Sequence, residues 1–215
     1  MHDMVNEYAL RQEIIAASIR MNDSGINQGT SGNISHRFGD GMLITPSSMP
    51  YDTLTPEDIM YVGPDGSAEG RNMPSSEWRF HLDILRARPE LNAVVHAHPT
   101  YATTIAIMGH AIPPIHYMVA VCGGPDIRCA PYATFGTPEL SAHAVKALEG
   151  RTACLLAHHG MIAAGKTLAK AMWLAVEVET LARQYHGCLQ LGDPPLLPVA
   201  EIENVLSRMA GYGHA

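Results

Sequence analysis

The sequence predicts one α/β domain in which helices pack on a mixed β-sheet. Helical and extended patterns are interspersed along the chain, and tight turns join several of the extended segments. The chain has 215 residues, carries no internal repeat and has no linker long enough to separate two domains. We therefore expect residues 1–215 to form a single domain.

The first part of the chain combines a long helix with short strands. Leu10, Ile14 and Met21 recur at helical spacing, which predicts a helix over residues 6–24 that Gly25 ends. Turn sequences rich in glycine and aspartate then separate short apolar runs. The elements expected here are a hairpin of strands 34–38 and 42–45, a short helix beginning at Thr55, and a strand over 59–62.

Helices and strands alternate in the rest of the chain. Ser75 or Ser76 can cap a helix that Pro89 ends, and Thr137 followed by Pro138 is typical of a helix start. Short apolar runs between these helices have the length of buried strands. The helices are expected over residues 76–88, 100–108, 137–150, 167–191 and 199–209, and the strands over 93–98, 129–133 and 153–157.

Composition excludes several classes of protein. The hydrophobic fraction of 47% and the charged fraction of 16% are typical of a soluble globular protein. The net charge of −7 argues against a generic nucleic-acid-binding protein, which would carry a basic patch, although one dipolar pocket can still bind a small anion. No segment approaches the roughly 18 consecutive apolar residues of a membrane span, so we expect none. Residues 1–6 are polar and lack a basic stretch followed by an apolar run, so we also expect no signal peptide.

Cysteine and histidine usage points to a reducing compartment and to chemistry at imidazole rings. The four cysteines form no Cys-x-x-Cys pair and no disulfide framework, so we expect free thiols in the cytoplasm. Histidine is abundant, with 12 residues, which suggests a metal site or acid–base catalysis without distinguishing the two.

The pair His96 and His98 is the first candidate metal site. Side chains alternate across a strand, so two histidines at this spacing project from the same face of the strand expected over 93–98. Two nitrogen ligands on one rigid element suit zinc. A single histidine is more often an ordinary structural residue, but the pair, followed by a second histidine cluster downstream, favours metal binding.

The second cluster, His158 and His159, follows another apolar strand. Adjacent strand residues face opposite ways, so only one of the two is expected to reach a metal, and spacing does not choose between them. Glu77, near a helix start, is a further candidate as a ligand or a general base. Taken alone, a glutamate at that position is more often a carboxylate that interacts with the helix dipole.

Three segments are candidates for binding an anion. The loop over residues 29–33 offers glycines and hydroxyl groups that can cradle a phosphate, and it contains no lysine of the type found in nucleotide-binding loops. The pair Ser47-Ser48 adds hydroxyls, and Ser75-Ser76 adds more at a helix N-terminus. Each segment alone is more often a turn or a cap; together they favour a phosphorylated substrate.

Taken together, these motifs resemble the class II aldolase/adducin family. The resemblance extends from about Leu10 to Tyr212 and rests on long blocks. It implies a three-layer domain with a central, mostly antiparallel sheet between helices, assembled as a C4 homotetramer whose active sites lie between subunits. The blocks are Asn27 to Asn33, Pro74 to His81, Val94 to His98, Ile115 to Met118, Cys129 to Thr137, and His158 to Gly160.

The family's roles carry over to matching positions of this chain. One Zn²⁺ per subunit would be held by three histidines and by a glutamate that leaves the metal to act as the base; these are His96, His98, His159 and Glu77. A neighbouring subunit would contribute Tyr117 as the acid. The phosphate pocket would consist of Gly32, Asn33, Ser47, Ser48, Ser75 and Ser76, and the aldehyde end would be lined by Phe135 and Tyr212.

The implied reaction is zinc-dependent retro-aldol cleavage of a ketose 1-phosphate. For a substrate of the L-fuculose 1-phosphate type, the products would be dihydroxyacetone phosphate and L-lactaldehyde. The sequence departs from the family member that it most resembles at Ser47-Ser48, which replaces a threonine–glycine pair, and modestly at residues 119–122. The serine at position 48 bears on how closely the backbone approaches the phosphate.

Other members of this family suggest alternative functions. The same chemistry can act on 5-deoxyribulose 1-phosphate or 5-methylthioribulose 1-phosphate, which share the phosphate end and differ in the aldehyde. A pentulose-phosphate 4-epimerase or a dehydratase is a weaker alternative, because the residues around Glu77 and Tyr117 favour the aldolase. A non-enzymatic adducin-like module is the weakest, because this chain retains all three metal histidines.

Overall fold

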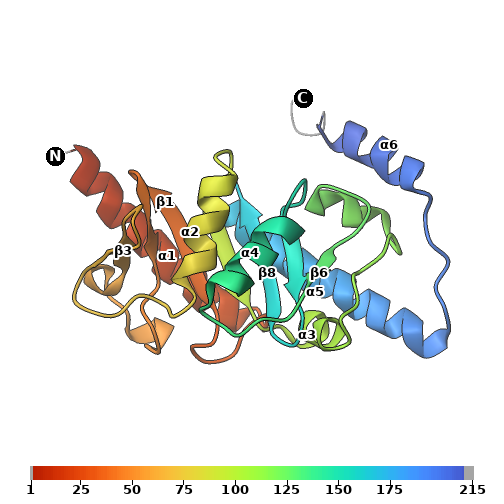
Figure 1. The fold of residues 1–215 in the computed structure, drawn as a ribbon, viewed down its shortest axis with the longest axis horizontal. Coiled ribbons are helices and arrows are strands. Elements are labelled where there is room, and N and C mark those ends of the chain that lie inside the picture. Colours follow the sequence, from red (N-terminus) through yellow and green to blue (C-terminus); the bar gives the residue numbers. More distant parts are fainter. Residues whose placement is uncertain (1, 211–215) are drawn as a thin grey trace.

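An eight-stranded sheet forms the centre of the molecule (Figure 1), a computed structural model that describes residues 2–210. The strand order is β4-β3-β2-β1-β5-β8-β7-β6, and every neighbouring pair is antiparallel except β6 and β7. The strands are β1 (Asn33–Phe38), β2 (Gly41–Ile44), β3 (Met60–Val62), β4 (Ala68–Glu69), β5 (Ala93–Ala97), β6 (Arg128–Ala130), β7 (Ala153–Leu156) and β8 (Gly160–Gly165).

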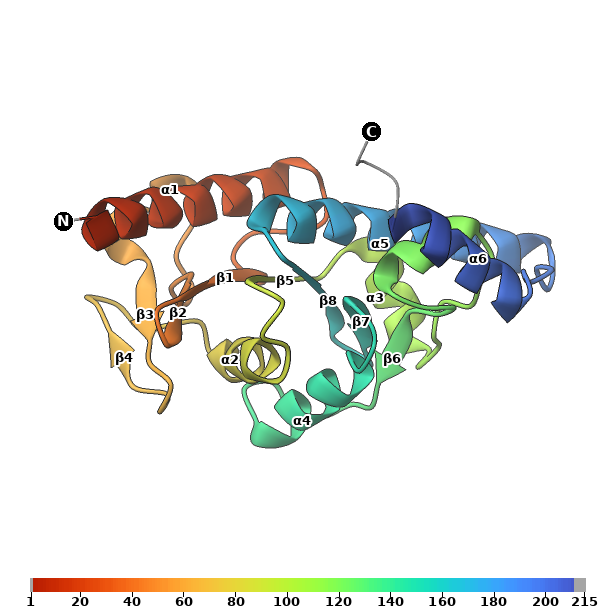
Figure 2. The ribbon, with the colours of Figure 1, turned by 90° about the horizontal axis from the view of Figure 1, so that it is seen from above.

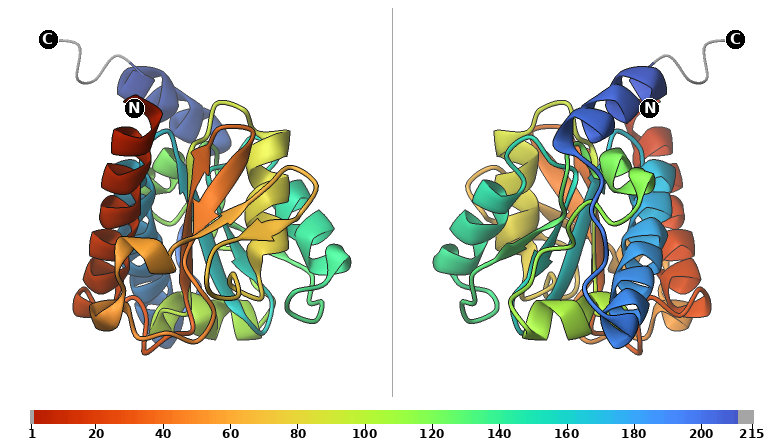
Figure 3. Two further views of the ribbon diagram at one scale, coloured as in Figure 1. Left: turned by 90° about the vertical axis from the view of Figure 1, so that its left-hand side faces the viewer. Right: turned by 90° about the vertical axis from the view of Figure 1, so that its right-hand side faces the viewer.

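Helices cover both faces of this sheet. Helices α1 (His2–Asp23) and α5 (Leu168–Leu191) lie along one face, and α2 (Trp78–Ala87) and α4 (Pro138–Ala147) lie on the other (Figures 2 and 3). This arrangement confirms the expected three-layer fold with a mostly antiparallel sheet. The remaining helices are α3 (Thr100–Ile107), α6 (Val199–Ala210), and the 3₁₀ helices η1 (Tyr51–Thr53), η2 (Pro56–Asp58) and η3 (Tyr117–Cys122).

Strand β5 separates two hydrophobic cores and thereby directs its histidine. Ala93, Val95 and Ala97 belong to the core that α1, α3 and α5 cover, whereas Val94 belongs to the core under α2 and α4. Because side chains alternate along a strand, His96 shares the face of Val94 and is directed toward the α2 layer. The register of the sheet pairs His96 with Asn33 of β1, so Asn33 is beside it on the same face.

Most of the expected elements are present, often one or two residues shorter. The prediction that Ser75 or Ser76 caps α2 is wrong: the N-cap is Glu77, and it makes no side-chain cap bond. Instead, the backbone N–H of Glu77 donates to Ser75 Oγ at 3.3 Å. Strands β4 and β8 were not expected. For β8 the reason is its content of glycine and alanine, which have low strand propensity.

Two structural observations bear on what the composition indicated: the state of the cysteines and the character of the helices. All four cysteines are free, as the absence of a disulfide framework predicted. Within residues 2–210, none of the helices combines the length and the apolar character needed to traverse a lipid bilayer.

Asp58 anchors the segment that leads to the Ser75–Glu77 region. Its Oδ2 accepts hydrogen bonds from the backbone and side chain of Thr55, and its Oδ1 accepts from Arg71 Nε and Asn72 Nδ2, each at 2.9 Å. Burial alone would raise the pKa of this carboxyl, but hydrogen bonds from Thr55, Asn72 and Arg71 outweigh that effect and lower the pKa from 3.8 to about 2.

We expect Asp58→Asn to lower the free energy of unfolding, and the loss to depend on pH. Because folding lowers the pKa, the ionised Asp58 stabilises the fold at pH values above 3.8, and this contribution disappears as the pH falls to about 2. Urea denaturation should therefore show that the difference in free energy of unfolding between wild type and Asp58→Asn narrows as the pH falls from 3.8 to about 2. Asp193→Asn, at an exposed carboxylate that accepts no hydrogen bond from residues 2–210, is the control. A difference of constant size would contradict the prediction.

Candidate metal centre and active site

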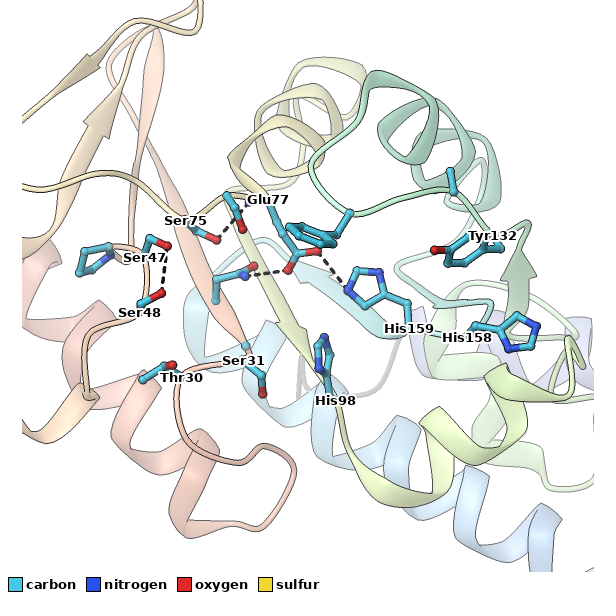
Figure 4. A pocket seen from close by; sticks show the side chains of 16 residues that line it. Thr30, Ser31, Ser47, Ser48, Ser75, Glu77, His98, Tyr132, His158 and His159 are labelled. Atoms are coloured by element: carbon cyan, nitrogen blue, oxygen red, sulfur yellow. Dashed lines mark hydrogen bonds and ion pairs between the residues drawn. The ribbon is translucent and has the colours of Figure 1, made fainter.

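Three histidines and one glutamate converge at one end of the central strands. His96 is the next-to-last residue of β5, and His98 follows that strand. His159 lies in the turn between β7 and β8, and Glu77 is the N-cap of α2. One ligand atom from each residue lies within 4.8 Å of the others. In Figure 4, the side chains of Glu77, His98 and His159 are directed toward one another. The structure thus brings together all four residues expected to bind a metal.

The distances between these groups are short. His96 Nε2 lies 2.9 Å from His98 Nε2 and 3.1 Å from Glu77 Oε2, and His159 Nε2 lies 3.1 Å from Glu77 Oε1. The three imidazole rings form a nearly equilateral triangle, with centroids 4.8, 4.8 and 5.0 Å apart. Four donor atoms at such spacing surround a common centre.

A backbone carbonyl of β8 determines which ring nitrogen of His96 carries the proton. Its Nδ1 lies 2.8 Å from the carbonyl oxygen of Met161, and a carbonyl can only accept, so Nδ1 carries the proton and donates. In the neutral ring, Nε2 then presents a lone pair to the cluster. A backbone carbonyl that holds the far nitrogen of a histidine in this way is typical of metal ligands.

The electrostatics of the cluster favour a cation. Burial alone would raise the pKa of Glu77, but the adjacent His96 and His159 outweigh it and hold the pKa of this carboxyl far below its usual range. Burial, together with the neighbouring His96 and His159, lowers the pKa of His98 to about 3, so its ring is neutral. Glu77 Oε1 is buried without a hydrogen-bond partner among the described residues. Lone pairs and an unpaired carboxylate oxygen around one centre fit a metal ion.

The turn between β7 and β8 distinguishes His159 from His158. Both residues lie in a turn rather than in a strand, and His158 adopts a left-handed backbone with φ of 55°. This turn directs His159 into the cluster, while the ring of His158 lies against Tyr132 with centroids 6.0 Å apart. Spacing left the choice open and the family resemblance implied His159; the structure brings His159, and not His158, to the other ligands.

A cavity of about 360 Å³ lies beside the cluster. In Figure 4, Ser47, Ser48 and Ser75 are on one side of this cavity and His159 is on the other. None of the described lining residues is a lysine or an arginine, so the wall is polar but not basic. The residues that were expected at the site and line this cavity are Gly32, Asn33, Ser47, Ser48, Ser75, Ser76, Glu77, His98, Phe135 and His159.

The cavity wall depends on two special backbone positions. A Cβ atom on Gly32 would lie 2.7 Å from the carbonyl oxygen of His96, so only glycine allows this loop to approach β5. Ser48 has a left-handed φ of 59°, and its Oγ lies 3.3 Å from Ser47 Oγ. The neighbouring Ser47 N–H donates to the carbonyl of Met73 at 2.9 Å, which ties this loop to the segment that precedes Ser75.

Among the expected site residues that the structure describes, His96 and Tyr117 do not line this cavity, and His96 is fully buried within the metal cluster. Tyr117 begins η3, is 50% exposed, and is not among the lining residues. Within one chain, the structure therefore does not bring it to the metal cluster. Tyr212 lies outside the described residues.

The cavity also has lining residues that were not predicted. These are Pro46, Tyr132 and Ala133; the other lining residues, Thr30, Ser31 and His158, belong to the loop expected to bind an anion and to the second histidine cluster. A signal for Tyr132 was available in the topology, because β6 and β7 are parallel and their carboxyl ends meet at the same edge of the sheet. Tyr132 follows β6 just as His158 follows β7, so the parallel pairing alone places both residues at the edge of the sheet where these strands end.

Comparison with known proteins gives a consistent result. The family model described as "Class II Aldolase and Adducin N-terminal domain" matches residues 12–186. A 5-methylthioribulose-1-phosphate/5-deoxyribulose-1-phosphate aldolase of Rhodospirillum rubrum is 55% identical over 95% of this chain and 93% of its own length. The L-fuculose phosphate aldolase of Escherichia coli K12 is 50% identical, with 95% of each chain covered.

A solved structure shares the same architecture. An L-fuculose 1-phosphate aldolase superposes with a TM-score of 0.90 at 38% sequence identity, covering 93% of this chain and 95% of the other. Class II aldolases are metal dependent, and the cluster of Glu77 and three histidines could hold a metal ion. The identities, the coverage and the fold together show that this chain belongs to the class II aldolase/adducin family and is one of its aldolases.

Proposed function

We propose that this aldolase uses Zn²⁺ to cleave a ketose 1-phosphate into dihydroxyacetone phosphate and an aldehyde. The observation that carries the proposal is the placement of the Glu77–histidine cluster on the wall of a cavity rich in hydroxyl groups. The metal ligands can act on the sugar carbons while the hydroxyls bind the phosphate. The substrates named for the relatives from R. rubrum and E. coli are phosphorylated sugars, which supports the same class of substrate here.

The donor set supports zinc as the metal. Three imidazole nitrogens and one carboxylate oxygen are ligands that zinc commonly takes, and three protein ligands with one exchangeable position are typical of catalytic zinc. His96, His98 and His159 would stay bound, and Glu77 would leave when substrate enters. Bound zinc would supply Lewis-acid stabilisation of negative charge on the substrate.

The hydroxyl-rich wall supports phosphate binding. Ser47, Ser48, Ser75 and Ser76 would donate hydrogen bonds to the phosphate oxygens, together with the side chain of Asn33 and the backbone of Gly32. The pair Ser75-Ser76 also precedes the N-terminus of α2, where the helix dipole favours an anion. Binding the phosphate at a fixed place would orient the C3–C4 bond toward the metal cluster.

Two residues would move protons. Glu77 would act as the base in synthesis, and in cleavage it would deliver a proton to C3 of the dihydroxyacetone phosphate half. Tyr117 would handle the proton at the oxygen on C4. Since Tyr117 is half exposed and outside the cavity of its own chain, we assign it to the active site of a neighbouring subunit in a C4 homotetramer.

This shared site predicts complementation between two inactive variants. Glu77→Gln and Tyr117→Phe should each have low turnover, but subunits mixed by dissociation and reassembly should regain activity. With random mixing in a closed ring, about one quarter of the sites combine an intact Glu77 with an intact neighbouring Tyr117. The coupled assay should therefore recover roughly a quarter of the wild-type rate. Each variant reassembled alone is the control, and no recovery in the mixture would place both residues in one chain.

The aldehyde end distinguishes two groups of candidate substrates, three sugar phosphates in all. L-fuculose 1-phosphate, which would release L-lactaldehyde, is the first, supported by the E. coli relative and the superposed structure. The second is 5-methylthioribulose 1-phosphate or 5-deoxyribulose 1-phosphate, supported by the 55% identity to the R. rubrum enzyme. Phe135, on the cavity wall, and Tyr212 would contact this variable end.

A substrate panel on the zinc-loaded protein tests the proposal. Each of the three sugar phosphates is supplied, and dihydroxyacetone phosphate is detected by a coupled enzyme, with chelated protein as the control. The highest kcat/KM identifies the aldehyde. If none of the three yields dihydroxyacetone phosphate and the substrate instead epimerises or loses water, the aldolase proposal is overturned in favour of a 4-epimerase or a dehydratase.

We also propose that the domain extends beyond the matched residues 12–186 to the whole of 1–215. Helix α6 supports this extent, because Ile202 is fully buried and the backbone N–H of Leu197 donates to the carbonyl of Pro114 at 2.9 Å. The free cysteines are consistent with a reducing compartment, and we assign the enzyme to the cytoplasm.

A further inference from the structure

A row of buried polar side chains leads from β1 and α2 to the carboxylate of Glu77. Ser35 and His81 are fully buried, and Asn33 is 4% exposed. Ser35 Oγ lies 2.8 Å from His81 Nδ1, His81 Nε2 lies 2.5 Å from Asn33 Oδ1, and Asn33 Nδ2 lies 3.0 Å from Glu77 Oε2. Two elements contribute: β1 with residues 33 and 35, and α2 with His81 and the N-cap Glu77.

The chemistry of Glu77 gives every bond in this row a direction. A carboxylate only accepts hydrogen bonds, so Asn33 must turn its Nδ2 toward Glu77 and its Oδ1 toward His81. Because Oδ1 also only accepts, His81 must carry its proton on Nε2. Burial lowers the pKa of His81 to about 3, so the ring is neutral and its Nδ1 accepts from the hydroxyl of Ser35.

These directed bonds hold only one of the two carboxylate oxygens. Oε2 accepts from Asn33 and also lies 3.1 Å from His96 Nε2, whereas Oε1 makes no hydrogen bond among the described residues and lies 3.1 Å from His159 Nε2. An asparagine amide is nearly symmetric in shape, and the Nε2 donor of His81 and the carboxylate of Glu77 both favour the orientation in which Nδ2 faces Glu77. Without that donor, Asn33 Oδ1 would be buried and unpaired, which is costly.

We propose that His81 is a positioning residue that sets the orientation of Glu77 through Asn33. The row anchors Oε2 and leaves Oε1 available to the metal cluster or to a substrate proton. This inference rests on the proposed roles of Glu77 as a displaceable ligand and a base. His81 itself contacts neither the cavity nor the metal ligands through a hydrogen bond, so it acts only through Asn33.

Two replacements of His81 with matched shape test the proposal. Glutamine and methionine have similar length, and both remove the stacking of the ring on Phe80. Only glutamine can place an N–H near the position of the imidazole Nε2. We expect His81→Met to lower kcat by roughly 10- to 100-fold, the loss typical of an outer partner of a metal site. His81→Gln should recover most of that loss, with little change in the KM for substrate in either variant.

A separate structural readout does not depend on activity. Crystal structures of the zinc-loaded variants should show the Glu77 carboxylate displaced in His81→Met and retained in His81→Gln. Ser18→Ala is a control for a buried hydroxyl whose only role is a hydrogen bond within α1, to the carbonyl of Ile14, and it should leave kcat unchanged. Equal kcat in the methionine and glutamine variants, with Glu77 unmoved in both, would overturn the proposal.

Neutron diffraction of the wild-type protein tests the row even if a variant does not fold. The inference requires deuterium on Nε2 of His81 and none on Nδ1; the opposite pattern contradicts it. This result is independent of the reaction that the enzyme catalyses. If the substrate panel fails while the neutron structure shows the expected proton, the row stands and the proposed function falls.

Discussion

Replacing Glu77 by glutamine is expected to abolish most turnover while leaving the fold intact. The amide has nearly the same shape and can still accept the hydrogen bond from Asn33 Nδ2, but it cannot transfer a proton. Loss of a general acid–base group commonly lowers the rate by about 10²- to 10⁴-fold, and we expect kcat to fall by on the order of 10³-fold. The coupled assay measures kcat, and thermal unfolding and zinc analysis show whether the variant is folded and loaded.

A second carboxylate provides the control for this substitution. Glu139, in the first turn of α4, is exposed and does not line the cavity. Glu139→Gln makes the same chemical change and should keep kcat near that of wild type. A zinc-loaded Glu77→Gln enzyme with near-normal cleavage would remove Glu77 from the mechanism and would leave it only a structural role.

Substitution of a cluster histidine by alanine is expected to release the metal. His96→Ala or His159→Ala removes one of three permanent ligands, and an alanine side chain offers no replacement. The loss of zinc affinity should exceed the roughly 100-fold upper range for outer-shell partners of a metal. Chelator competition measures the affinity, elemental analysis measures the zinc retained after gel filtration, and turnover should fall in parallel.

The adjacent histidine offers a matched control for the metal. His158 is next to His159 in sequence, but its ring lies against Tyr132 instead of joining the cluster. Asparagine tolerates the left-handed backbone at this position, so His158→Asn preserves the turn. This variant should retain wild-type zinc content. Full zinc occupancy in His159→Ala, or equal loss in both variants, would contradict the assignment of the ligands.

The fold was predictable where local pattern and tertiary context agree. In α1, the buried residues Ile14, Ala17 and Met21 recur at helical spacing, and Thr137 followed by Pro138 correctly predicted the start of α4. Strand β8 was missed because its glycines and alanines have weak strand preference; it forms because β5 and β7 pair with it on both sides. Ser75 was expected to cap α2, but it lies two residues before the N-cap, Glu77, whose backbone N–H donates to Ser75 Oγ.

The site was partly predictable for a similar reason. The spacing of His96 and His98 on a strand required both to lie on one side, and this needed no knowledge of the fold. Selection between His158 and His159 depended on the turn after β7, which no local pattern specified. The contact of His81 with Asn33 joins residues 48 positions apart, so only the folded structure reveals it. The role of Tyr117 depends on a second subunit and stays a prediction.

Ser48 has a consequence for engineering this enzyme. Its left-handed backbone, with φ of 59°, is strained for most side chains and is accepted most readily by glycine, asparagine and aspartate. In a mutant library that randomises this position, most variants would carry a residue that disfavours this conformation. The loop around Ser48 would then shift, however well the new side chain could bind a ligand. The neighbouring Ser47 lines the same cavity and has no such backbone restriction. Directed evolution toward altered phosphate groups should therefore vary Ser47 freely and restrict Ser48 to the few residues that keep its conformation.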